Sequence, residues 1–154
     1  MADKYWIGNK PDKSVSTVAE SGTAAGVDIG GIVKLSKTLA FGDFTDGGST
    51  AGTFTFGESI PAGAVFLRAV ATTVTGFAGD TSATITIGDG TDVDRYNTGT
   101  PNVFATAAAG VDLGVPSGVA NHSAAKAPVV TITSGADWGD VDAGSITLEL
   151  YYII

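Results

Sequence analysis

The feature of this sequence that most restricts its fold is a two-residue alternation of apolar and other side chains near its end. The residues of one parity there are all apolar: Ile146, Leu148, Leu150, Tyr152 and Ile154. The intervening positions 145–151 hold Ser, Thr, Glu and Tyr. Successive side chains of a β-strand point to opposite faces, so this spacing predicts a strand with one face in a core.

The same alternation recurs in short segments from residue 29 onward, separated by Gly, Asp, Pro and Asn. Its clearest examples lie within 33–41, 53–56, 83–87 and 130–133. The run 64–75 differs because apolar residues occupy both parities: Val65, Phe66, Leu67, Val70 and Val74. That arrangement predicts a central strand covered on both faces. About seven or eight such segments, with no helix-length amphipathic pattern to cover a single sheet, predict an all-β fold, a single antiparallel β-sandwich or jelly-roll-like domain.

The first 28 residues show neither strand nor helix periodicity, and 154 residues suit one compact domain. We therefore predict an extended N-terminal arm over 1–28 and a β-sandwich over 29–154. Tyr5, Trp6 and Ile7 form an apolar tip on this arm. Leaving them in water would waste their apolar area, so we expect them to dock either on their own domain or on a neighbour.

The charge of the chain restricts its partners. The net charge is −8 and only 16% of residues are charged, against roughly 25% in typical domains. Nucleic acids and anionic membranes need clustered Lys and Arg, so neither is expected as a partner. Residues 1–37 hold five Lys and four acids, and the rest three bases and twelve acids. A near-neutral arm on an acidic body can fold back or reach a neighbour, and a surface of Thr, Ala, Ser and Gly costs little to desolvate.

Few residues suggest catalysis or a cofactor. With no cysteine and a single histidine, the sequence offers no thiolate chemistry, and His122 in a small-residue segment is expected to be a solvated loop residue rather than a catalytic base. Two aspartate groups fall in predicted turns: Asp89, Asp92 and Asp94, and then Asp137, Asp140 and Asp142. Turn formation is the preferred interpretation of both groups, ahead of calcium binding and of glycoside hydrolysis. We predict no enzyme activity and no cofactor.

Arg95 is one of only two arginines and follows Asp94 directly. Its planar guanidinium suits bidentate pairing with a carboxylate. We expect it to hold an aspartate of its own loop or of a neighbouring subunit, and we group it with the arm tip as a candidate partner-binding residue.

Several segments resemble small virion proteins of tailed bacteriophages. They are TFTFGESIPAGA (53–64) with the long strand after it, ATITIGD (83–89), DVDR (92–95) and AGSITLELYY (143–152). The resemblance covers roughly residues 50–154. It implies a capsid cement (decoration) protein that binds the major capsid protein as a trimer at local three-fold positions of the shell, after assembly in the bacterial host cytoplasm. No residue-level function comes with it, because a cement protein acts through a surface.

Three alternatives remain open from the sequence. The chain could be a tail or head-fibre component of a virion. It could be a carbohydrate- or receptor-binding module, which would need Trp138, Tyr151 and Tyr152 to gather in an exposed groove. A glycan-cleaving enzyme built on the aspartate turns is the third.

Overall fold

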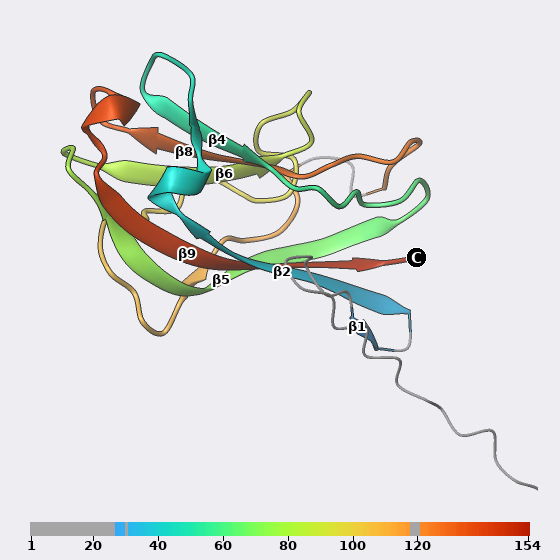
Figure 1. The fold of residues 1–154 in the computed structure, drawn as a ribbon. Helices are drawn as coiled ribbons and strands as arrows, with labels where there is room; N and C mark the ends of the chain where they lie inside the picture. Colours follow the sequence, from blue (N-terminus) through green and yellow to red (C-terminus); the bar gives the residue numbers. More distant parts are fainter. Residues whose placement is uncertain (1–26, 30, 118–120) are drawn as a thin grey trace, which may run out of the picture.

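A computed structural model describes residues 27–29, 31–117 and 121–154, and these form two stacked β-sheets (Figure 1). Its strands are β1 (Val27–Ile29), β2 (Ile32–Ala40), β3 (Thr45–Asp46), β4 (Ala51–Thr55), β5 (Val65–Ala78), β6 (Ala83–Gly88), β7 (Val111–Asp112), β8 (Val129–Ser134) and β9 (Ala143–Ile153). Two 3-10 turns, η1 (Phe41–Asp43) and η2 (Trp138–Asp140), are the helical elements of this part of the chain. Within these ranges no helix has the length and apolar character needed to cross a membrane.

The two sheets have the orders β1-β2-β9-β5-β7 and β3-β4-β8-β6, and every strand pair is antiparallel. The pairing is nested along the chain: β2 pairs with β9, β4 with β8 and β5 with β7, while Thr84 of β6 bridges to Asn102. This nesting is jelly-roll-like. The predicted all-β sandwich is therefore confirmed. Of the predicted arm, the structure describes only Val27 and Asp28, which belong to β1.

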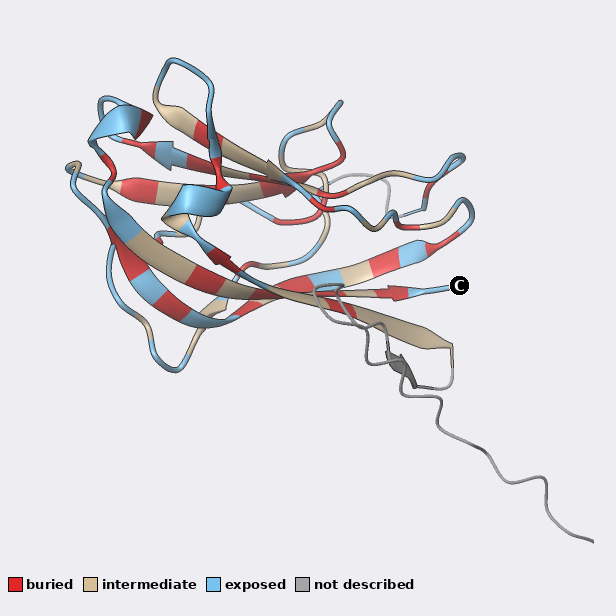
Figure 2. Ribbon diagram, in the orientation of Figure 1, coloured by how far each residue is buried: buried red, intermediate tan, exposed pale blue. Residues whose placement is uncertain are grey.

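The core lies between the sheets, where the buried bands of both layers face each other (Figure 2). The alternation predicted for the last segment is confirmed for four of its five residues, since Ile146, Leu148, Leu150 and Tyr152 of β9 are all buried. Ile154 follows the strand and is exposed. Phe41 also departs from the predicted strand 33–41, because the chain turns into η1 there, with Asp43 accepting a hydrogen bond from the Ala40 amide at 2.8 Å.

The prediction that β5 is covered on both faces is wrong for the described residues. Three register shifts against β9, between Phe66 and Arg68, Ala71 and Thr73, and Thr75 and Ala78, change the parity of the strand. These bulges keep residues of both parities in the core, namely Phe66, Ala69, Ala71, Val74 and Phe77. The other apolar residues turn outward, so that Val65 is 41% exposed.

One end of the core is closed by Trp138 of η2. Its indole lies 5.5 Å from the Phe44 ring and 6.4 Å from the Phe77 ring, centroid to centroid. The indole also covers the backbone of Gly52 in β4, where a Cβ atom would lie 2.2 Å from the ring. Only a glycine leaves room for the indole at this point.

Candidate functional site

The outer face of the five-stranded sheet changes character from one end to the other. Strand register aligns its outward residues in rows across β2, β9 and β5. The rows are Ile32, Ile153 and Val65, then Lys34, Tyr151 and Arg68, then Ser36, Glu149 and Val70, and finally Thr38, Thr147 and Thr73. This face is therefore apolar at the Ile153 end and threonine-lined at the other.

A groove of about 440 Å³ opens on the apolar half of this face. Its lining comes from three strands: Ile32 of β2, Leu67, Arg68 and Val70 of β5, and Glu149 and Tyr151 of β9. Leu67 occupies the first register shift of β5 and has no partner residue on β9. Because of this extra residue, Leu67 and Arg68 both line the groove, while Phe66 and Ala69 on either side of them lie in the core. The outward apolar residues of 64–75 were the sequence signal for this groove, although that signal was assigned to a covered strand.

Two polar residues of the groove lining, Glu149 and Tyr151, are paired with each other and with Lys34 of β2. Lys34 Nζ donates a hydrogen bond to Glu149 Oε1 at 2.8 Å, and the Tyr151 hydroxyl donates to Glu149 Oε2. The bond from Lys34, followed by the one from Tyr151, holds the pKa of Glu149 below its usual value. The bond to Glu149 in turn raises the pKa of Lys34 and of Tyr151. The Glu149 carboxylate is therefore an acceptor for both neighbours, with its charge balanced by Lys34.

The outer face of the four-stranded sheet carries no charge on its three longer strands. No Asp, Glu, Lys or Arg occurs in β4, β6 or β8. Register places five of its outward threonines in two rows, Thr53 with Thr131 and Thr86, and Ala51 with Thr133 and Thr84. We call Thr53, Thr84, Thr86, Thr131 and Thr133 the threonine face. Such a face can meet another protein without burying an unpaired charge.

Arg95 pairs with an aspartate of its own loop, as predicted. Its Nη1 lies 3.6 Å from Asp89 Oδ2, and its Nη2 donates to the carbonyl oxygen of Asn121 at 3.2 Å. Lys126 Nζ lies 3.9 Å from the same Asp89 oxygen. Arg95 thus joins the loop after β6 to the segment before β8. A role for it in binding a partner stays a prediction.

Asp89 is a structural carboxylate at the centre of this cluster. It is buried and accepts hydrogen bonds from the amides of Thr91 and Asp92, each at 2.9 Å. Burial by itself would raise the pKa of Asp89, but the two amides and the charges of Lys126 and Arg95 lower it below the usual value. The turn predicted for the first aspartate group is therefore confirmed at Asp89.

His122 is buried, so the prediction of a solvated loop histidine is wrong. Its Nε2 lies 2.8 Å from the Tyr96 hydroxyl, with which it shares a hydrogen bond. Burial, followed by the positive charge of Arg95, lowers the pKa of His122, and burial raises that of Tyr96. The pair joins the same two loops as Arg95. The sequence could not show this contact, because its partners are 26 residues apart.

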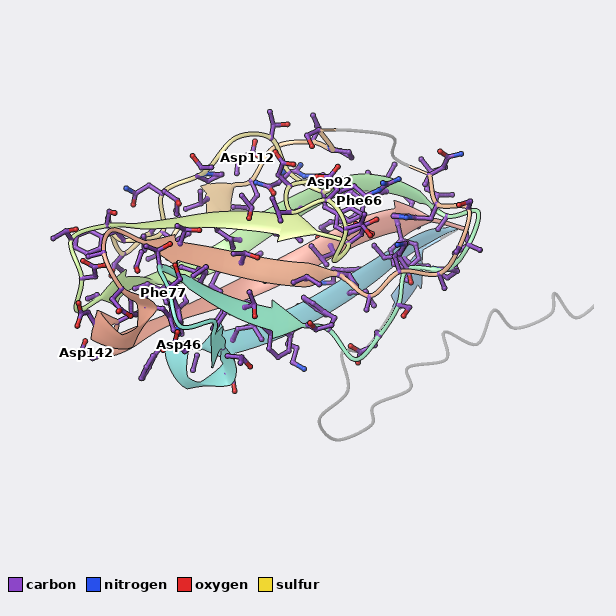
Figure 3. All side chains as sticks on the ribbon, turned by 90° about the horizontal axis from the view of Figure 1, so that it is seen from above. Asp46, Phe66, Phe77, Asp92, Asp112 and Asp142 are labelled. Atoms are coloured by element: carbon purple, nitrogen blue, oxygen red, sulfur yellow. The ribbon has the colours of Figure 1, made fainter. Side chains whose placement is uncertain are left out.

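In the second aspartate group, Asp137 also accepts a hydrogen bond from a backbone amide. Asp137 caps η2 by accepting from the Gly139 amide at 2.8 Å, while Asp140 and Asp142 are exposed. Figure 3 shows Asp142 and Asp46 far from Asp92 and Asp112. Across the described ranges, no three His, Cys, Asp or Glu side chains come together as a metal site.

The aromatic residues needed for a carbohydrate groove do not gather. Trp138 and Tyr152 are buried, whereas Tyr151 lies on the outer face. Tyr5, Trp6 and Ile7, the predicted partner-binding tip, lie outside the described residues.

Comparisons with known proteins add little to this picture. No protein-family model matches the chain, and no curated protein matches it. A solved structure titled "Cyanophage Pam1 capsid asymmetric unit" has a chain that aligns over 97% of this chain and 99% of its own, with a TM-score of 0.49 and 15% identity. A likeness at this level carries no argument about function.

Proposed function

We propose that this chain is a structural, non-enzymatic protein of a bacteriophage virion. In this proposal it binds the major capsid protein at the shell surface as a cement (decoration) protein and forms a trimer at local three-fold sites. The virion, the capsid partner and the trimer come from the resemblance of residues 50–154 to such proteins. The described structure supplies a rigid sandwich with a surface suited to docking.

The observation that carries the proposal is the threonine face. Typical soluble domains have about 25% charged residues, and charged groups resist burial. Here β4, β6 and β8 carry none, and the net charge of −8 comes mainly from acids elsewhere in the chain. Threonine favours strands and keeps a hydroxyl for hydrogen bonds across an interface. We infer that this face contacts neighbouring capsid subunits.

A charge placed at the centre of this face tests the proposal. Thr131 lies in register between Thr53 and Thr86, so Thr131→Asp would bury an unpaired carboxylate on docking. We expect this variant to bind purified shells of the parent virus about tenfold more weakly or worse, a loss of about 1.4 kcal/mol. The matched control is Thr147→Asp on the other sheet, which should bind normally.

Binding is measured by cosedimentation with shells, and circular dichroism checks that both variants fold. Electron microscopy of particles locates the bound protein, and light scattering gives its oligomeric state. A tail or fibre location would refute the cement role and support the alternative virion role. Equal binding by the two variants would instead exclude the threonine face as the contact.

A further inference from the structure

The groove on the five-stranded sheet is an apolar surface that the described strands leave open. The residues beside it, Val65 and Ile153, are 41% and 39% exposed although they lie in register on adjacent strands. Burying this exposed apolar area would be favourable. Anything that covers it comes from outside the described residues or from another molecule.

The shape and lining of the groove suit aromatic and aliphatic side chains. Its volume of about 440 Å³ lies in the range of sites that take small organic groups. Ile32, Leu67 and Val70 supply apolar walls, and Tyr151 adds a ring. Arg68 is the cation of the lining, and its only ion pair in the described residues is with the exposed Asp112 at 3.7 Å. A guanidinium in that position can stack on an indole or phenol.

The chain contains a segment with matching chemistry. Tyr5, Trp6 and Ile7 are consecutive apolar residues within the first 26. Residues 1–26 carry three Lys and three acids, so they approach a body of charge −8 without net repulsion.

The residues between the tip and β1 are long enough to reach the groove. β1, which follows this segment, is separated from β5 by β2 and β9, a distance of about 15 Å at the usual strand spacing. The 20 residues from Ile7 to Val27 can span at most about 66–72 Å.

We propose that Tyr5, Trp6 and Ile7 dock in this groove on their own chain. The tether keeps the tip at an effective concentration on the order of 1 mM. A tip with a Kd of about 0.1 mM for the free groove is then docked in about nine chains of ten. The docked tip covers the apolar walls of the groove. This inference stands whether or not the protein belongs to a virion.

The test uses the full chain with one spin label. Because the chain has no cysteine, Asn9→Cys gives a single site for a nitroxide next to the tip. We expect the amide signals of Leu67, Val70 and Tyr151 to lose at least about half their intensity in a dilute sample. Amides of Thr131 and Thr133, on the opposite sheet, should keep theirs.

Three variants test whether the signal loss comes from the tip in the groove. Leu67→Glu places a charge in the groove and should restore the groove signals, whereas Thr73→Glu, on the same strand and face but outside the groove, should leave the loss unchanged. Trp6→Ala should also restore the signals, and it changes no residue of the folded body.

A mixture of isotope-labelled chains without nitroxide and unlabelled chains with it reports on docking between copies. No loss is expected there at 0.1 mM. Loss in the mixture equal to that in the single-chain sample would overturn docking on the same chain in favour of exchange between copies. Uniform loss over the body, loss on another face, or no loss anywhere would overturn the groove as the site.

Discussion

Replacing Gly52 tests whether the Trp138 indole is fixed in place as the structure shows it. A Cβ atom at residue 52 would lie 2.2 Å from the indole, against an ordinary contact of 3.4–4 Å, so the ring must move by roughly 1 Å. The Phe44 and Phe77 rings lie around it, and the Trp138 amide donates to the Ser49 carbonyl oxygen at 2.9 Å. A close-packed core leaves little room for that movement.

The size of the effect follows from two opposing terms. Overpacking of this kind costs about 1–3 kcal/mol. Replacing a strand glycine by alanine recovers about 0.4–1 kcal/mol by restricting the unfolded chain. We therefore expect Gly52→Ala to lower the free energy of unfolding by about 1–2 kcal/mol and Tm by about 2–8 °C.

Urea and thermal unfolding followed by circular dichroism measure this change without relying on tryptophan emission. Gly57→Ala is the matched control, because residue 57 is exposed and its added Cβ would meet nothing within 4 Å. It should be neutral or slightly stabilising. Trp138→Phe should remove most of the cost of Gly52→Ala in a double-mutant cycle. If Gly52→Ala is as stable as Gly57→Ala, the packing of the indole on β4 is wrong.

Two further predictions concern the loops before β8. Because burial lowers the pKa of His122, the free energy of unfolding should fall as pH drops below about 6.5. Unfolding titrations between pH 7.5 and 5 measure this pH dependence. We expect it to be weaker in His122→Gln. A similar slope in the variant would assign it to other groups. Asp89→Ala leaves the amides of Thr91 and Asp92 without their acceptor and Arg95 without its counter-charge, and it should cost about 2 kcal/mol in urea unfolding. The exposed Asp140→Ala should stay within about 0.5 kcal/mol of the parent. Equal costs for the two would contradict a structural role for Asp89.

The sequence predicted those parts of the fold that depend on local pattern. Residues 146–152 alternate without interruption because β9 has a regular register against β2, so each side chain could be assigned to a face. The same reasoning failed on β5, where three shifts against β9 change the parity within one strand. A bulge inserts a residue without an obvious sequence signal, and the outward apolar residues were therefore assigned to a covered strand.

The candidate site was predictable only where its contacts are close in the chain. Arg95 and Asp89 lie in one loop, and an aspartate of that loop was one of the two partners expected for Arg95 from its chemistry. The burial of His122 depends on Tyr96 from a distant loop, and the groove requires side chains from three strands to meet. The threonine face also emerged only once register aligned β4, β8 and β6.

The position of β9 has a consequence for how the molecule is made. This strand comes after all the others in chain order, yet it lies between β2 and β5 and pairs with both along most of its length. During synthesis, the edges of β2 and β5 that pair with β9 therefore stay unpaired until residues 143–153 leave the ribosome. Pairings this distant in sequence form slowly and expose edges that can join other chains. A chain that is cut short before β9 therefore keeps one unpaired edge on β2 and one on β5.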